Sequence, residues 1–408
     1  MKKTRSIFLL FILTLMASSA RGQLTVVSGT VMDSDSRTPI AGAAVTMGSS
    51  AVVTNDDGFF TLKTSGVVDE IVVSHLGYTS QHLGVTTFSE QPLLVMLKPA
   101  AIQLQEVVVV SGDARELVLA AIDRIPDNYS RTSELLRCFY REMVMKRQSY
   151  ISVSEGVVDV YKTDYRRGIL HDRTAIRKGR RLMSARPSDT LSVKVMGGPT
   201  MALQLDIAKN PEFLLNADEL DLYELRMEIP TTIADRRQYV VSLKPRADAE
   251  YALFFGRLYI DEETLAFTRA ELELDQSDRV KATRAILVKK PVGLRFRPKE
   301  MSFIMDYRTS ADGITRLSYL RSTIRFNCDW RRRLFATSFS AFCELAVTDT
   351  PIYDGHPIRG RDSFDQRDAF YDKVDFFYDP AFWEDYNIIE PTVTLDKAID
   401  KLLKRKNN

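Results

Sequence analysis

Histidine is scarce in this sequence, with four among 408 residues. A zinc peptidase usually pairs a His with a nearby Glu and adds a distant second His, and no histidine here has Glu three residues on. No Gly-x-Ser-x-Gly elbow occurs, and the glycine pair at 197–198 lacks the Lys and Ser/Thr of a phosphate-binding loop. The histidines are His75, His82, His171 and His356. We therefore predict no catalytic residues, no metal and no cofactor.

Cysteine is equally rare, and the three residues are Cys138, Cys328 and Cys343. An odd number in an oxidising compartment permits one disulfide and leaves one thiol over. A bridge between Cys328 and Cys343 is one alternative. We favour three buried free thiols, because cysteine packs well as a small apolar residue.

An excess of one charge is also absent, since 56 basic residues face 54 acidic ones. This balance predicts no nucleic-acid partner. The N-terminal apolar run, Ile7 to Met16, follows three basic residues and is too short to span a membrane. It has the pattern of a secretory signal peptide over residues 1–22, cut before Gln23. We expect an exported protein with no transmembrane segment in the mature chain, in the periplasm or outer membrane or at the cell surface.

The stretch from Val27 to Leu62 alternates short apolar strands with turn formers. The run at 33–39 reads DSDSRTP and separates two strands. A later strand stops at Asn55-Asp-Asp-Gly58, where Gly58 can supply the positive φ of a tight turn. The pattern predicts a small β-sandwich.

Three motifs in this stretch carry a family resemblance. They are Gly29-x-Val31, Pro39-x-x-Gly42-Ala-x-Val45 and Thr54-Asn-Asp-Asp-Gly58-x-Phe60. With them the chain resembles the carboxypeptidase regulatory-like domain, which implies a seven-stranded transthyretin-like β-sandwich over residues 24–99. In that family the module is an accessory of Gram-negative cell-envelope proteins and not a peptidase.

A linker strand is expected over residues 100–112. Its run Leu104 to Val110 resembles the segment that joins this module to the plug of TonB-dependent receptors. The chain is too short for the barrel that should follow, so a receptor function is not implied. We expect the strand to bridge two domains; the alternative is an exposed β-strand that pairs with a partner.

Residues 113–408 are predicted to form a larger α+β domain on a curved antiparallel sheet, which makes the whole chain β-rich. Asp113 can cap a helix that ends at Pro126. Clean alternation with intervening turn signals runs from Tyr239 to Phe326 and predicts a meander with one wet face. A last helix is expected with Thr394 as its cap.

The run from Gly256 to Phe267, between two alternating strands, resembles the sheet of periplasmic lipoprotein carriers of the LolA type. In that family a half-open sheet holds acyl chains against its concave apolar face. The resemblance implies a face for lipid or another apolar ligand, with candidates Met301, Phe303, Met305 and Leu272, because methionine adapts to irregular cargo. The alternative, which we favour, is that this face buries helices as ordinary core.

Aromatic side chains gather between Phe376 and Tyr386. Trp383 and Tyr386 are candidate ligand-binding residues, since rings stack on sugar faces while Glu384 and Asp385 could bind hydroxyls. We favour an aromatic plug that seals the C-terminal segment onto the sheet.

The accessory nature of the first domain, together with the lack of a recognisable active site, favours a non-catalytic binding or assembly role. We expect it to act in the cell envelope, at the outer membrane, through protein or glycan contacts. The first alternative is a periplasmic carrier of lipid or another apolar ligand in the second domain. A hydrolase built on a carboxylate pair is a further alternative.

Overall fold

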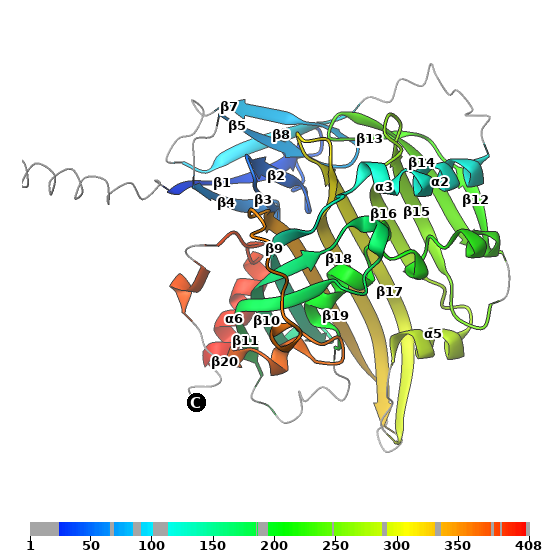
Figure 1. The fold of residues 1–408 in the computed structure, drawn as a ribbon. Helices are drawn as coiled ribbons and strands as arrows, with labels where there is room; N and C mark the ends of the chain where they lie inside the picture. The colour runs from blue at the N-terminus through cyan, green and yellow to red at the C-terminus, as the bar shows by residue number, and fades with distance from the viewer. Residues whose placement is uncertain are drawn as a thin grey trace, which may run out of the picture.

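The structure, a computed structural model, describes residues 24–65, 69–84, 91–100, 113–184, 186, 195–246, 249–287, 292–330, 336–376, 379–383 and 386–404. The predicted signal peptide and nearly all of the predicted linker strand lie outside these residues. Figure 1 shows two parts, a small sandwich in blue to cyan and a large sheet in green to orange against which it lies.

The N-terminal part is a β-sandwich of two four-stranded sheets, ordered β4-β1-β8-β6 and β3-β2-β5-β7. Only Ser80 separates β6 from β7, so we treat them as halves of one strand that crosses between the sheets. Counted in this way, the described part of the sandwich has seven strands, as predicted. The strands are β1 (Leu24–Asp33), β2 (Ala44–Met47), β3 (Ser50–Val53), β4 (Phe59–Ser65), β5 (Glu70–Ser74), β6 (Tyr78–Thr79), β7 (Gln81–Gly84) and β8 (Leu93–Pro99). Inward-facing residues such as Val31, Val45 and Leu62 are fully buried between the sheets.

The predicted turn at Asn55–Gly58 is present. Oδ1 of Asn55 accepts hydrogen bonds from the backbone nitrogens of Asp57 at 3.0 Å and Phe59 at 2.9 Å. Gly58 has a φ of +74°, and a Cβ there would lie 2.5 Å from the carbonyl oxygen of Val31. Only glycine fits this position, so the local sequence fixes the turn.

The second part is built on a twelve-stranded sheet in the order β12-β14-β15-β16-β17-β18-β19-β9-β10-β11-β20, with β13 beside β14. The alternation predicted from Tyr239 to Phe326 is confirmed, and every strand pair is antiparallel except β11 with β20. Its strands are β9 (Glu134–Lys146), β10 (Ser149–Lys162), β11 (Arg173–Met183), β12 (Tyr223–Met227), β13 (Thr231–Ile233), β14 (Arg236–Pro245), β15 (Phe254–Asp261), β16 (Phe267–Leu274), β17 (Leu294–Thr309), β18 (Thr315–Trp330), β19 (Thr337–Asp349) and β20 (Asp375–Phe376).

One side of this sheet, which we call the inner face, packs against helices and loops and forms the largest core cluster. The helices on it include α2 (Ala114–Asp123) and α4 (Met201–Gln204), and the neighbouring short helices are α3 (Ile125–Asn128) and α5 (Arg279–Ile286). Asp113 caps α2 as predicted, because its side chain accepts from the backbone nitrogen of Arg115 at 2.9 Å.

The opposite side, the outer face, carries the sandwich and the C-terminal helix α6 (Val393–Lys404). Strand β3 packs on β19, and the apolar side of α6 packs on β10 and β11. The prediction of Thr394 as the cap is wrong by two residues. Thr392 Oγ1 accepts from the backbone nitrogen of Leu395 at 3.1 Å, and Asp57 of the sandwich accepts from that of Val393 at 2.7 Å.

The three cysteines are free and buried, as predicted. In the register of β18 and β19, Cys328 lies opposite Thr337 and Cys343 opposite Ser322. The two thiols are therefore too far along the strands to bridge. Within the described part of the chain, no helix has the length and apolar character to cross a membrane.

Candidate functional site

A line of mostly charged side chains crosses the outer face of the large sheet. Each member lies directly opposite the next in the strand register, so neighbouring side chains are within reach of one another. In strand order the line is Arg226, Ser242, Arg257, Glu271, Ile304, Arg321, Glu344, Arg141, Glu155, Arg180 and Asp375. From Arg321 onward the charges alternate in sign.

That alternating half is covered. Arg321 contacts Asp56 of the sandwich at 3.1 Å. Arg141 is buried and donates to the carbonyl oxygen of Ile389 at 2.6 Å. The sandwich and the C-terminal segment therefore cover this part of the line and supply partners for its charged side chains.

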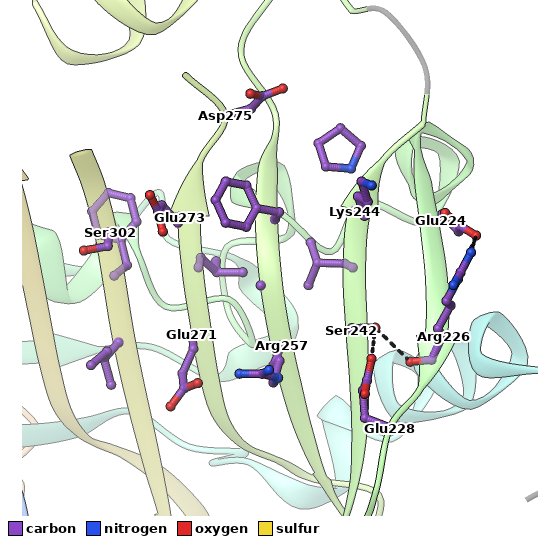
Figure 2. Close-up of a pocket in the computed structure, with 17 residues that line it drawn as sticks. Glu224, Arg226, Glu228, Ser242, Lys244, Arg257, Glu271, Glu273, Asp275 and Ser302 are labelled. Atoms are coloured by element: carbon purple, nitrogen blue, oxygen red, sulfur yellow. Dashed lines mark hydrogen bonds and ion pairs between the residues drawn. The ribbon is translucent and has the colours of Figure 1, made fainter. Parts of the chain in front are cut away.

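The other half of the line borders an open hollow of about 910 Å³ over β12 and β14–β17. Figure 2 shows Arg257 and Glu271 side by side on neighbouring strands, with Glu273 further along the strand of Glu271. The side chains around the hollow are Glu224, Arg226, Glu228, Ser242, Lys244, Phe255, Arg257, Glu271, Glu273, Asp275, Ser302 and Ile304.

Four carboxylates of the hollow have partners within the protein. Glu228 accepts from the hydroxyl of Ser242 at 2.7 Å, and Asp275 accepts from the backbone nitrogen of Ser277 at 2.8 Å. Glu224 binds Nε of Arg226 at 2.8 Å. Glu271 accepts from Nε of Arg269 at 2.8 Å and from the hydroxyl of Tyr259 at 3.1 Å. Burial and this carboxylate raise the pKa of Tyr259 to about 12, so the phenol stays a donor. These ion pairs and hydrogen bonds fix the positions of the carboxylates in the hollow.

Other groups are free to meet a partner. The side chains of Arg257 and Lys244 are exposed and make no hydrogen bond or ion pair with any described residue. Glu273 likewise has no partner there, and burial followed by the nearby Glu300 raises its pKa. Phe255 is 39% exposed. Free cations, a carboxylate and an exposed ring therefore lie together in one hollow, and these are group types that protein binding surfaces use.

Four of the predicted ligand-binding residues come together on the inner face. Leu272 lies directly opposite Phe303, and Met305 is fully buried beside them, while Met301 is partly buried against the same core. The Phe303 ring contacts the ring of Phe213, 5.8 Å away between centroids. Among the described residues, helices and loops fill the space in front of this face, and a ligand role for it stays a prediction.

The other two predicted residues lie on the outer face. Trp383 is 6% exposed and packs with Val53 of the sandwich and Phe139 of β9. Tyr386 is partly buried, and its ring centre is 5.8 Å from Nζ of Lys178. Trp383 therefore packs between the sandwich and the sheet, and a ligand role for Trp383 and Tyr386 stays a prediction. Glu384 and Asp385 lie outside the described residues.

Sequence reasoning missed the free groups of the hollow. Side chains alternate between the two faces of β15, so Phe255 and Arg257 lie on the face opposite to that of the buried Leu258. Their exposure could therefore be predicted from the sequence. The pattern does not say which part of the wet face remains uncovered, since that depends on where the sandwich docks. Within the described residues, no three His, Cys, Asp or Glu side chains gather as a metal site.

The fold is β-rich, an N-terminal sandwich followed by a larger antiparallel-sheet domain. Residues 27–109 match the family model of the CarboxypepD_reg-like domain, which confirms the resemblance of the first domain. No curated protein matches the chain.

Similar solved structures include a DUF1329 family protein of Desulfovibrio piger, with 11% identity, a TM-score of 0.26, and 59% of this chain and 95% of that chain covered. A LolA superfamily protein of Nitrosomonas europaea has 10% identity and a TM-score of 0.23, covering 57% and 94%. MucB, solved in complex with MucA, has 12% identity and a TM-score of 0.18, covering 59% and 94%.

Proposed function

We propose that this chain is a non-catalytic binding protein of the cell envelope that holds a protein or glycan partner in the hollow on its outer face. The observation that carries the proposal is the pair of unpaired cations, Arg257 and Lys244, on an open face of a rigid sheet. An exposed charge without a partner in its own chain is available to a second molecule.

The size and chemistry of the hollow suit such a partner. Its volume of about 910 Å³ is at the upper end of the range for ligand sites. A guanidinium binds carboxylates in a two-pronged fashion, and a ring such as that of Phe255 can stack on a sugar or cover an apolar side chain. Glu273 adds an acceptor for hydroxyl or amino groups.

The hydrolase alternative needs two carboxylates in different protonation states. Glu271 and Glu273 are the acidic groups of β16 that face the hollow. Because Glu271 accepts hydrogen bonds from Arg269 and Tyr259, its role is to orient those two side chains. The pair therefore favours binding over acid–base work.

The envelope location rests on the signal-peptide pattern of residues 1–22 and on the accessory role of the family that the first domain resembles. In this arrangement the sandwich is a docked scaffold, and the exposed end of the large sheet is the working surface.

The test compares the wild-type chain with Arg257→Glu and with Arg297→Glu, an exposed arginine of β17 outside the hollow. Immobilised protein is exposed to detergent-extracted envelope proteins in one arm and to isolated Gram-negative cell-wall sacculi in the other. We expect one arm to show binding that Arg257→Glu reduces about tenfold and Arg297→Glu leaves unchanged. Equal binding by all three proteins, or none in either arm, would contradict the proposal.

A further inference from the structure

A second cavity, separate from the hollow, lies between the sandwich and the outer face of the large sheet. Its volume is about 120 Å³. The sandwich supplies Ala44, Val53 and His75 to its walls, and the sheet supplies charged side chains from β14, β16 and β17. A space of this size holds a group of only a few heavy atoms.

Two of the arginines in its walls are neutralised. Arg236 contacts both carboxylate oxygens of Asp261 at 2.6 Å. Arg269 contacts Asp306 at 2.7 Å in addition to Glu271. Each of these guanidinium groups therefore has a full negative charge beside it.

The third arginine, Arg308, has no such partner. Arg308 is partly buried, and its side chain makes no hydrogen bond or ion pair with the described residues. Its cross-strand neighbour is another cation, Arg316, which is itself held by Glu134 and Asp312. Burial and Arg316 lower the pKa of Arg308, yet a guanidinium remains charged at neutral pH.

A second polar group in the same walls is unsatisfied. Nδ1 of His75 is buried and has no hydrogen-bond partner among the described residues. Burial, followed by the charge of Arg269, lowers the pKa of His75 to about 4, so the imidazole is neutral at pH 7. A neutral imidazole carries one N–H, and with that hydrogen on Nδ1 it can donate to a bound anion.

We propose that this cavity between the domains is a binding site for a small anion, a carboxylate or phosphate group held by the guanidinium of Arg308. An unpaired cation away from bulk water is costly, and its fork of N–H donors matches the oxygens of both anions. Because the walls come from both domains, a bound anion stabilises the docked arrangement. The site is independent of the hollow and of the function proposed for it.

The experiment measures thermal unfolding and calorimetric binding with inorganic phosphate and with acetate, against sodium chloride at equal ionic strength. For the wild-type chain we expect at least one of the two anions to raise the Tm by roughly 3 °C at saturation. Arg308→Gln should weaken binding about tenfold or more and abolish that rise. Removing an unpaired cation leaves no carboxylate stranded, so this variant should fold.

Two controls make the result specific. Arg297→Gln changes an exposed arginine of the same strand outside the cavity, and Arg257→Glu changes the hollow; both should keep the full anion effect. An equal rise in Tm for Arg308→Gln would overturn the proposal, as would a wild-type Tm that neither anion moves beyond the chloride control.

Discussion

Two buried glutamates on neighbouring strands, Glu142 of β9 and Glu155 of β10, have pKa values shifted in opposite directions. Glu142 faces the inner core, where burial raises its pKa to about 7. A hydrogen bond from the hydroxyl of Tyr140 at 2.6 Å lowers the pKa but does not offset the effect of burial. Glu155 faces the covering segments. Burial raises its pKa, but Arg141 and Arg180 outweigh that effect and lower it overall. The charged partners, and not the depth of burial, decide the direction.

The raised pKa of Glu142 makes stability fall as pH rises. Its native state holds a proton that the unfolded chain releases above about pH 4.5, so the stabilisation present below that pH is lost as pH passes 7. The difference amounts to about 3 kcal/mol. We expect Glu142→Gln to unfold at a higher temperature than wild type at pH 8 and at a similar one at pH 4.5.

Thermal unfolding across pH 4.5 to 8 checks this. Glu228→Gln, a change at an exposed position of the hollow, is the control and should follow the wild-type profile. A Glu142→Gln profile parallel to wild type over the whole range would show that Glu142 does not titrate there.

Glu155 should behave as the centre of a buried ion cluster. Its oxygens contact Nε of Arg141 at 2.8 Å and Nη2 of Arg180 at 2.9 Å. Glu155→Gln strands a buried guanidinium, and we expect a loss of about 3–5 kcal/mol in urea unfolding. The partly exposed pair Glu300–Arg325 is the comparison, where Glu300→Gln should cost less than about 1 kcal/mol. Similar losses in both variants would refute the cluster role.

At the scale of elements, the C-terminal segment protects an edge strand of the sandwich. Strand β4 ends its sheet, and edge strands carry unpaired backbone groups. The side chain of Asn387 accepts from the backbone nitrogen of Lys63 at 2.7 Å and donates to its carbonyl oxygen at 2.8 Å. One amide thus replaces a neighbouring strand.

Asn387→Ala should loosen this segment at a cost of about 1–3 kcal/mol, because both backbone groups of Lys63 lose their partner. Hydrogen exchange would report faster exchange at the Lys63 amide and in α6. Asn387→Asp keeps the acceptor and should leave the Lys63 amide protected. Unchanged exchange in Asn387→Ala would mean that other contacts hold the segment.

Elements whose partners are close in sequence were predictable. The Asn55–Gly58 turn and the Asp113 cap follow from residues within a few positions of one another. The start of α6 was misplaced by two residues although its cap Thr392 is local, because Thr392 and Thr394 both fit a cap by residue type. Its second cap, Asp57, lies 336 positions before Val393 and leaves no local signal. The same limit applies to the candidate site: alternation marks Arg257 as outward-facing, but only long-range docking decides that its part of the sheet stays open.

At the scale of the whole molecule, the two domains are joined by a small shared core. The sandwich and the inner face each have their own buried cluster. A third cluster on the outer face combines Val53 of the sandwich with Phe139 of β9 and with Trp383 and Ile389 of the C-terminal segment. Lys63 adds a hydrogen bond to the carbonyl oxygen of Trp383 at 2.9 Å. We therefore expect cooperative unfolding of the chain to depend on this third cluster.

Trp383→Ala should uncouple the domains. The Trp383 ring packs edge-on against Phe139 at 5.6 Å, and the guanidinium carbon of Arg180 lies 5.2 Å from its centre. Its removal should cost about 3–5 kcal/mol at the interface and leave the two separate cores intact. We expect calorimetry to show one transition for the wild type and two for Trp383→Ala. Trp383→Phe, which keeps a ring, should retain a single transition at a slightly lower temperature. A single transition at the wild-type temperature for Trp383→Ala would show that the domains are coupled through other contacts, with the Asn387 and Asp57 hydrogen bonds the first to test.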